Sequence, residues 1–183
     1  MKSKYYNNIT RTLLTKIRTS SAFAIVFFGC TAGTFAQVSA TATASATIVT
    51  PITITNASNI KFGNVAVNSS LGTVVLTPAG TRSTTGGVTL PVIAGTVAAG
   101  SFTVTGQPNY TYSITLPGAA NTISSGGNNM TVDTWTSTPA GTGTLSAGGT
   151  QTLNVGATLH VAGSQAAGTY TSGTPFTVTV NYN

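Results

Sequence analysis

Side chains that could carry out chemistry are scarce in this chain. Its 183 residues include one acidic residue, Asp133, one histidine, His160, and one cysteine, Cys30. A metal centre, a pair of catalytic carboxylates and a disulfide framework each require several such groups. The sequence therefore predicts a protein without a metal site and without a cofactor.

One catalytic arrangement remains formally possible, a Ser-His-Asp triad that uses Asp133 and His160. Both residues fall on predicted strands, His160 on the same polar face as Thr158 and Asp133 on the same face as Trp135. No Gly-x-Ser-x-Gly elbow occurs, and no Lys or Arg follows the glycine pairs as in a phosphate-binding loop. We interpret both residues as solvated surface positions and predict that the chain is not an enzyme, with a hydrolase as the third-ranked hypothesis.

Positive charge is concentrated at the start of the chain. Five of the seven Lys and Arg residues lie within the first 18 positions, and the remainder holds Lys61 and Arg82 against Asp133, a net charge of +1. Tight nucleic-acid binding needs several cations that neutralise phosphates together. The sequence thus predicts no nucleic-acid partner.

The first 36 residues have the organisation of an export signal. A basic and polar segment, 1–21, precedes a short apolar run, 22–28, and then small residues that end at Ala36. This order predicts a secretory signal peptide, residues 1–36, that is cleaved after Ala36. The apolar run is too short to span about 30 Å of hydrocarbon, so we expect no stable membrane anchor. A retained anchor and lipid attachment at Cys30 are the alternatives.

Cleavage after Ala36 gives a mature chain that starts at Gln37 and has no cysteine. We expect this chain to pass through the periplasm to the cell surface or the extracellular space. It would then reside in an oxidising compartment without using disulfides.

From Gln37 onward, short β-rich runs alternate with turn signals, and no helical periodicity persists. This pattern favours an all-β fold, an antiparallel β-sandwich, in residues 51–183. The expected strands are 38–49, 51–55, 60–67, 72–77, 88–93, 101–106, 109–116, 130–136, 151–161 and 174–182. The expected turns include Pro78-Ala79-Gly80, Gly86-Gly87, Pro117-Gly118, Gly126-Gly127, Pro139-Ala140-Gly141 and Gly148-Gly149.

The last predicted strand alternates between apolar and polar residues, so that one of its faces is apolar. The candidate inward face of this strand consists of Phe176, Val178, Val180 and Tyr182.

The N-terminal segment 37–50 alternates even more regularly. One face is apolar and the other carries only Ser and Thr between positions 39 and 47. Three interpretations remain open: a first strand of the chain's own sandwich, a flexible Ala/Thr-rich leader, or a donor strand that completes a neighbouring subunit. The candidate donor face consists of Val38, Ala40, Ala42, Ala44, Ala46 and Ile48.

An ordered series of short motifs resembles the bacterial family catalogued as domain of unknown function 4402. Its pieces are residues 46–52, Phe62-Gly63-Asn64-Val65, and residues 72–76, 102–112, 114–117, 154–159, 167–170 and 176–182.

That family in turn is similar to the fimbrial subunits of chaperone–usher systems and to spore-coat-U-type domains. The shared features are the length of an exported chain, the Phe62-Gly63 step, the late Gly168-x-Tyr170 and the penultimate Tyr182. The resemblance implies an immunoglobulin-like sandwich that lacks one strand, which the N-terminal extension of the next subunit supplies. This chain departs from the pattern because it has no disulfide and because its extension offers mostly alanine.

Two main functions follow. The first is an exported structural or adhesive subunit of a surface fibre or coat that assembles by β-strand addition. Its expected partners are copies of itself or other fimbrial-type subunits, together with a periplasmic chaperone and an usher. The alternative is a monomeric module that binds carbohydrate or ice through Thr-x-Thr surfaces. Trp135 with Tyr110 or Tyr112 could form a sugar-stacking platform, but packing in the core or as a cross-strand pair is the favoured interpretation of these rings.

Overall fold

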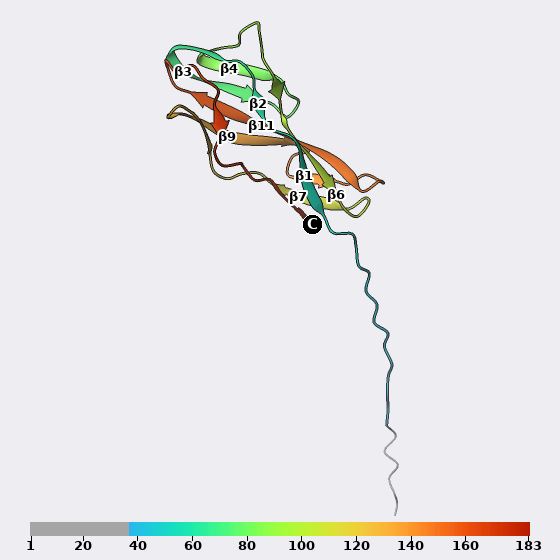
Figure 1. The fold of residues 1–183 in the computed structure, drawn as a ribbon. Coiled ribbons are helices and arrows are strands. Elements are labelled where there is room, and N and C mark those ends of the chain that lie inside the picture. The colour runs from blue at the N-terminus through green and yellow to red at the C-terminus, as the bar shows by residue number, and fades with distance from the viewer. Residues whose placement is uncertain (1–36) are drawn as a thin grey trace, which may run out of the picture. The chain divides into compact units, whose positions relative to one another are not determined.

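The computed structural model describes residues 37–183, which fall into two units, 37–46 and 47–183. The predicted signal peptide, 1–36, lies outside the described residues. Within the described part of the chain there is no helix, and all strand pairs are antiparallel (Figure 1). The prediction of an all-β antiparallel fold is confirmed.

Thirteen strands form the unit 47–183. They are β1 (Thr53–Ser58), β2 (Lys61–Phe62), β3 (Ala66–Leu76), β4 (Arg82–Thr89), β5 (Val97–Ala98), β6 (Gly100–Thr105), β7 (Thr111–Thr115), β8 (Asn121–Ser125), β9 (Asn128–Thr138), β10 (Thr142–Thr144), β11 (Thr150–Val161), β12 (Thr171–Ser172) and β13 (Thr179–Tyr182).

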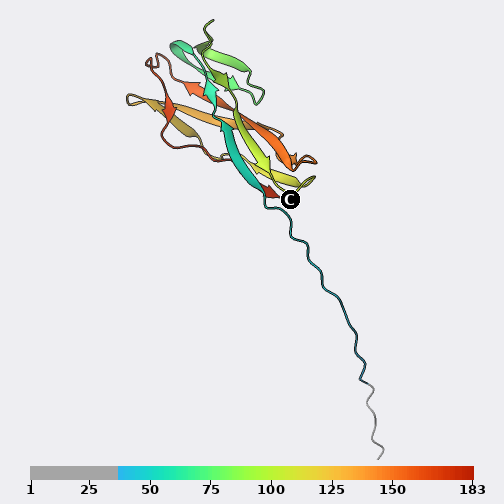
Figure 2. The same ribbon diagram turned by 45° about the vertical axis from the view of Figure 1, so that its right-hand side comes forward.

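These strands form one large sheet and two small ones (Figures 1 and 2). The large sheet has the order β1-β6-β11-β9-β8-β12, and β3 pairs with both β11 and β4. The second sheet has the order β10-β7-β13, and β2 pairs with β5. Strand β11 is the centre of the fold because it pairs with β6 along its first half, with β3 along its second half, and with β9 on its other side.

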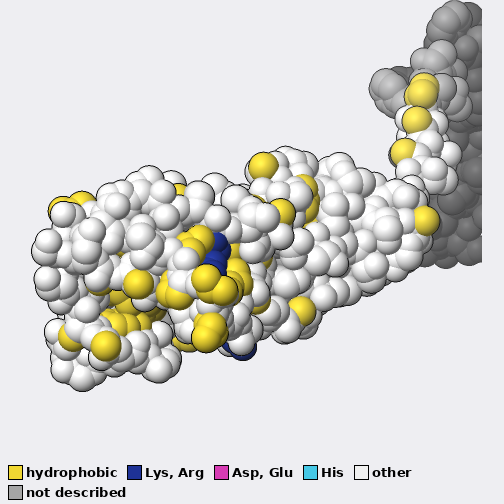
Figure 3. Space-filling model, turned by 90° about the horizontal axis from the view of Figure 1, so that it is seen from above, with side chains coloured by type: hydrophobic (Ala, Val, Ile, Leu, Met, Phe, Trp, Pro, Cys, Tyr) yellow, Lys and Arg dark blue, Asp and Glu magenta, His cyan; other side chains and the backbone are white. Residues whose placement is uncertain are grey.

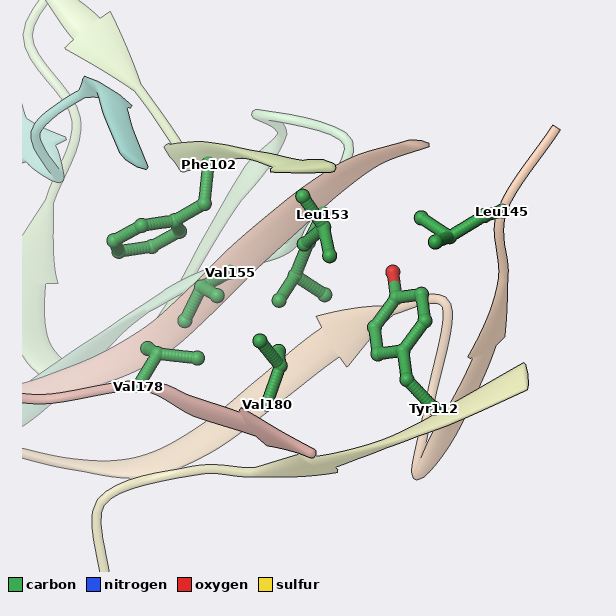
Figure 4. Close-up of a cluster of buried hydrophobic side chains, with 8 residues drawn as sticks. Phe102, Tyr112, Leu145, Leu153, Val155, Val178 and Val180 are labelled. Carbon is green, nitrogen blue, oxygen red and sulfur yellow. The ribbon is translucent and has the colours of Figure 1, made fainter. Parts of the chain in front are cut away.

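A first core cluster lies between the large sheet and the β10-β7-β13 sheet. Figure 4 shows side chains from β6 and β11 pointing toward side chains from β7 and β13. This facing arrangement makes a sandwich, as the sequence predicts. The cluster consists of Phe102, Val104, Tyr112, Leu145, Leu153, Val155, Val178 and Val180.

A second core cluster is built on the other half of β11. Apolar side chains of β3, β4 and β9 pack there against the alternating inward residues of β11. Phe62 of β2 packs against this second cluster. Its buried members are Val74, Val88, Val132, Ala157, Leu159 and Val161. The two clusters lie at opposite ends of the fold, and β11 contributes side chains to both of them.

The predicted turn at Gly86-Gly87 is wrong, because both glycines lie inside β4. Gly86 pairs with Gly72 across a register shift between β3 and β4, and it has a φ of 65°. A Cβ atom at Gly86 would lie 2.3 Å from the carbonyl oxygen of Leu71. The glycines therefore permit a close approach of two strands at a β-bulge instead of reversing the chain.

The Gly126-Gly127 turn is confirmed, with positive φ at both glycines between β8 and β9. Other strands differ from the sequence predictions. The predicted strand 88–93 is wrong over residues 90–93, because β4 ends at Thr89, and the predicted last strand 174–182 begins only at Thr179. Strands β5, β8, β10 and β12 were not predicted.

Candidate functional site

The C-terminal strand β13 has one paired edge and one open edge. It pairs with β7 from Thr179 to Tyr182, and no other described strand pairs with it. Along residues 176–182 every second side chain is buried or half-buried, and the residues between them are exposed. The inward set is Phe176, Val178, Val180 and Tyr182, all of which belong to the first core cluster or pack against it.

Strand β1 is the corresponding edge of the large sheet, because it pairs only with β6 among the described strands. It lies close to β13. Two half-buried isoleucines, Ile52 just before β1 and Ile54 within it, pack against the same core cluster. We call the neighbouring edges of β1 and β13, with these two isoleucines and the inward set of β13, the β1/β13 seam.

The strand order explains why this seam is open. The order β1-β6-β11-β9 corresponds to strands A-B-E-D of an immunoglobulin domain, and the pair β7-β13 corresponds to strands C and F. In that fold strand G pairs with the free edge of F. No strand of the described residues occupies that position here, so the seam is where a complete immunoglobulin sandwich would carry one more strand.

Tyr182 ties the end of β13 to the segment that leads into β1. Its hydroxyl accepts a hydrogen bond from the Gln107 amide at 2.6 Å and donates one to the Thr50 carbonyl at 2.7 Å. The Gln107 side chain also accepts a hydrogen bond from the Thr50 amide at 3.1 Å. These contacts fix the entry to β1 directly beside the chain's C-terminal end.

The surroundings of Tyr182 are shaped to admit its ring. The ring of Tyr110 packs edge-on against it, with centroids 5.6 Å apart. A Cβ atom at Gly106 would lie 2.2 Å from the Tyr182 hydroxyl oxygen. Glycine is therefore required at position 106 for the hydroxyl to reach its two backbone partners.

Tyr112 connects the two sheets beneath the seam. It is fully buried on β7, and its hydroxyl donates to the side-chain oxygen of Gln151 on β11 at 2.7 Å. The same oxygen accepts the Thr144 amide at 2.9 Å. Burial raises the pKa of the Tyr112 hydroxyl, so the group stays protonated as a donor.

Trp135 is half-buried, and its ring packs toward the core. Its ring lies 4.4 Å from that of Phe176, and it packs against both core clusters. The register between β9 and β11 shifts beside Thr134, which has a φ of 50°, and this bulge turns Trp135 inward while Asp133 stays on the outer face. The prediction that Asp133 and Trp135 share a face is therefore wrong.

The proposed sugar-stacking platform does not form. Trp135 packs on Phe176, Tyr110 packs on Tyr182, and Tyr112 is buried. Each of the three rings is occupied by a different contact within the domain.

The six residues of the candidate donor face are all exposed, and the segment 37–50 forms no strand. Val38 is 93% exposed and Ile48 is 98% exposed. The expected strand at 38–49 is thus wrong for this single chain. An alternating strand of alanines buries little apolar surface by itself and has no paired backbone to hold it.

Asp133 and His160 are brought together across β9 and β11. The Nε2 atom of His160 lies 2.8 Å from the Oδ1 atom of Asp133, and both side chains remain more than a third exposed. The hydrogen bond from His160 holds the pKa of Asp133 below its usual value. In the described part of the chain, no serine or threonine hydroxyl hydrogen-bonds to this imidazole.

Residues 37–183 contain no group of three or more His, Cys, Asp and Glu side chains arranged to hold a metal ion. They also contain no helix with the length and apolar character needed to cross a membrane.

A shallow polar depression lies beside β8, near the edge of the large sheet that is opposite to β1 in the strand order. Its lining has hydroxyls and amides and no aromatic ring. Asn121 donates to the Thr174 carbonyl there and accepts from Ser172, so part of this lining is already hydrogen-bonded.

A protein-family profile described as "Domain of unknown function (DUF4402)" matches residues 52–182 of the chain. Comparisons with curated proteins and with solved structures give no significant match. The matched segment starts at the seam residue Ile52 and ends at Tyr182, so it includes both edges of the seam and excludes the alternating segment that precedes it.

Proposed function

This chain belongs to the family described as Domain of unknown function (DUF4402), and we propose that it is an exported structural subunit of a bacterial surface fibre or coat. Assembly occurs by β-strand addition: residues 38–48 of one copy pair with the β13 edge of the next. The observation that carries this proposal is the open β1/β13 seam at the position of immunoglobulin strand G.

The seam and the N-terminal segment are complementary in pattern. The seam offers a free backbone edge above a row of buried and half-buried apolar side chains. The segment offers an unpaired backbone and an unbroken apolar face over eleven residues. Added strands of this kind gain affinity from main-chain hydrogen bonds and specificity from alternate side chains.

Backbone pairing supplies most of the binding energy in this account. Each interchain hydrogen bond contributes about 0.5–1.5 kcal/mol net, and a strand of this length forms several. Each buried CH₂ contributes roughly 0.8 kcal/mol, so the alanine knobs add little and the terminal Val38 and Ile48 add more. The expected result is an assembly that is weaker than one made with large donor residues.

The N-terminal sequence supports export. Residues 1–36 have the order of a cleavable signal peptide, and the mature chain has a net charge of +1. Self-association, a periplasmic chaperone and an usher are the proposed partners, and the cell surface or extracellular space is the proposed location. A non-enzymatic role is part of this proposal, in which the exposed Asp133–His160 pair is a surface contact between β9 and β11.

The test compares two substitutions on opposite faces of the segment. Ala42→Asp places a carboxylate in a dry seam, where an unpaired charge is costly, while Ser39→Asp places it on the polar face. We expect Ala42→Asp to lower the polymer fraction at least tenfold and Ser39→Asp to leave it nearly unchanged, as measured by size exclusion after native export. Equal effects of the two changes, or a wild type that stays monomeric at high concentration, would contradict strand addition.

A second candidate function is supported by the register of the outer face of the large sheet. Threonines line up there in two rows across β1, β6 and β11, about 4.8 Å apart between strands and about 6.7 Å along each strand. The rows are Thr53, Thr105 and Thr150, and Thr55, Thr103 and Thr152. Such a regular hydroxyl surface suits a flat ligand such as ice or crystalline polysaccharide.

Retention on ice or crystalline cellulose distinguishes this candidate from the first. If the threonine rows bind the surface, Thr103→Glu abolishes retention and Thr85→Glu, on another exposed position, does not. Retention by a chain that remains monomeric would favour the binding module. Equal behaviour of wild type and Thr103→Glu would eliminate it.

A further inference from the structure

The loop that follows β4, residues 90–95, exposes apolar side chains that a monomer does not need. Val92 is fully exposed, Ile93 is 78% exposed and Leu90 is 36% exposed. Neither core cluster includes any of these three side chains. Figure 3, which views the molecule from above, shows hydrophobic side chains gathered beside the Lys and Arg side chains, and further hydrophobic side chains elsewhere on the same face. Exposed apolar groups of this kind mark interaction sites.

The exposure of these side chains is not a result of loose packing, because hydrogen bonds from Asn64 hold the backbone of the loop in place. The amide of Asn64 donates to the Ala94 carbonyl at 2.7 Å, and its side chain donates to the Ile93 carbonyl at 3.1 Å. Arg82 in turn donates to the carbonyls of Phe62 and Asn64. The backbone of the loop is anchored while the side chains of Val92 and Ile93 remain in solvent.

This loop lies at the end of the unit 47–183 opposite to Tyr182. Strands β3 and β4, which precede the loop, pair beside the second half of β11, up to Val161. Tyr182 and Gly106 lie beside the start of β11, where Thr150 pairs with Thr105. Figures 1 and 2 show β3 and β4 at one end and the C-terminus at the other.

We propose that loop 90–95 docks against a second copy of this chain, on the end that carries Tyr110 and Pro51. This inference rests on the proposed function. A donor strand that adds antiparallel to β13 of the acceptor copy begins beside the acceptor's Tyr182 and ends beyond the start of β13. The domain of the donor copy therefore follows at the end of the acceptor where loop 90–95 lies. Residues 37–50 extend over about 45 Å at roughly 3.3 Å per residue, which is enough to pass along residues 174–182.

The end that the second copy presents is suited to an apolar contact. Tyr110 is 45% exposed beside Tyr182, and Pro51 is exposed next to Thr50. The residues that surround them, 106–109 and 146–149, carry no charged side chain. Tyrosine is one of the residues enriched among the side chains that contribute most to interfaces.

Cysteine cross-linking of the assembled, exported chain tests the contact. Val92→Cys and Tyr110→Cys are combined in one chain, with Cys30→Ser in every variant, and treated with short and long bifunctional maleimides. We expect a ladder of covalent multimers from the double variant, and none from either single variant or from the pair Thr85→Cys and Tyr110→Cys. Polymers that form normally but give no ladder would overturn this inference and leave the proposed function intact.

A second measurement does not depend on cross-linker geometry. Val92→Asp with Ile93→Asp should lower the mean polymer length at least threefold, while Thr96→Asp, an exposed position just after the loop, should not. Ala42→Asp, by contrast, should remove polymers altogether. Equal lengths for the loop variants and the control, or Val92-dependent binding to anionic lipid vesicles with unchanged polymers, would show that a second copy is not the occupant.

Discussion

Replacing Tyr182 by phenylalanine removes one hydroxyl that joins the end of β13 to the segment that leads into β1. In the wild type that oxygen accepts from the Gln107 amide at 2.6 Å and donates to the Thr50 carbonyl at 2.7 Å. The ring itself can remain against Tyr110, because that edge-on contact does not involve the hydroxyl. The substitution thus isolates the polar tie from the packing.

The expected loss follows from the number of bonds. Two hydrogen bonds at about 0.5–1.5 kcal/mol each give a destabilisation of about 1–3 kcal/mol. The half-buried Gln107 amide loses its acceptor, and an unsatisfied donor that is removed from water costs additional free energy. We therefore expect the destabilisation to lie in the upper half of that range. Because the surface exposed on unfolding does not change, the denaturant slope should stay constant while the midpoint falls.

Urea unfolding followed by tryptophan fluorescence measures this difference, with Trp135 as the probe. Tyr110→Phe is the matched control, since the Tyr110 hydroxyl has no hydrogen-bond partner among the described residues. Its free energy of unfolding should stay within about 0.5 kcal/mol of that of the wild type, as for other surface changes. A Tyr182→Phe midpoint no lower than that of Tyr110→Phe would refute the view that Tyr182 locks the entry to β1.

Three further outcomes are expected. Gly106→Ala should destabilise about as much as Tyr182→Phe, and the two should be non-additive in a double-mutant cycle, because the added Cβ would displace the Tyr182 hydroxyl. Asp133→Asn should cost about 0.2–1 kcal/mol at pH 7. Since contact with His160 lowers the folded-state pKa of this carboxyl, that difference should vanish in urea titrations as pH falls below about 4. Intact mass of the exported chain should show Gln37 as the first residue; a chain that starts at Met1 or a lipidated Cys30 would refute cleavage after Ala36.

The period-two pattern was enough to predict the most buried strands. The inward residues of β11, such as Val155 and Leu159, and the alternation along residues 176–182 follow directly from the sequence. A strand that is buried on one face must alternate, and any shift by one residue would expose its whole apolar set.

The bulges could not be predicted from the same pattern. At Thr134 one extra residue on β9 reverses which side chains face inward, so Trp135 enters the core and Asp133 meets His160 outside. At Gly86 two strands approach too closely for a side chain. Both features depend on the partner strand, which local periodicity does not identify.

The open seam could not be predicted from local sequence either. An edge strand and a central strand have the same alternation, and only the pairing of β13 with β7 alone shows which of the two it is. The ties of Tyr182 to Thr50 and Gln107 span 132 and 75 residues. The signals of this site in the sequence were the penultimate tyrosine of an alternating strand, the alternating segment 37–50 and the resemblance to subunits that lack one strand.

Amide hydrogen exchange, resolved by residue in assembled and in monomeric protein, tests strand addition most directly. In the polymer, the amides of residues 38–48 and those on the open edge of β13 should become protected together, because each supplies hydrogen bonds to the other. In the Ala42→Asp monomer both sets should exchange rapidly, while the amides of β11 stay protected in either state. Rapid exchange of residues 38–48 in a polymer of the wild type would contradict the account.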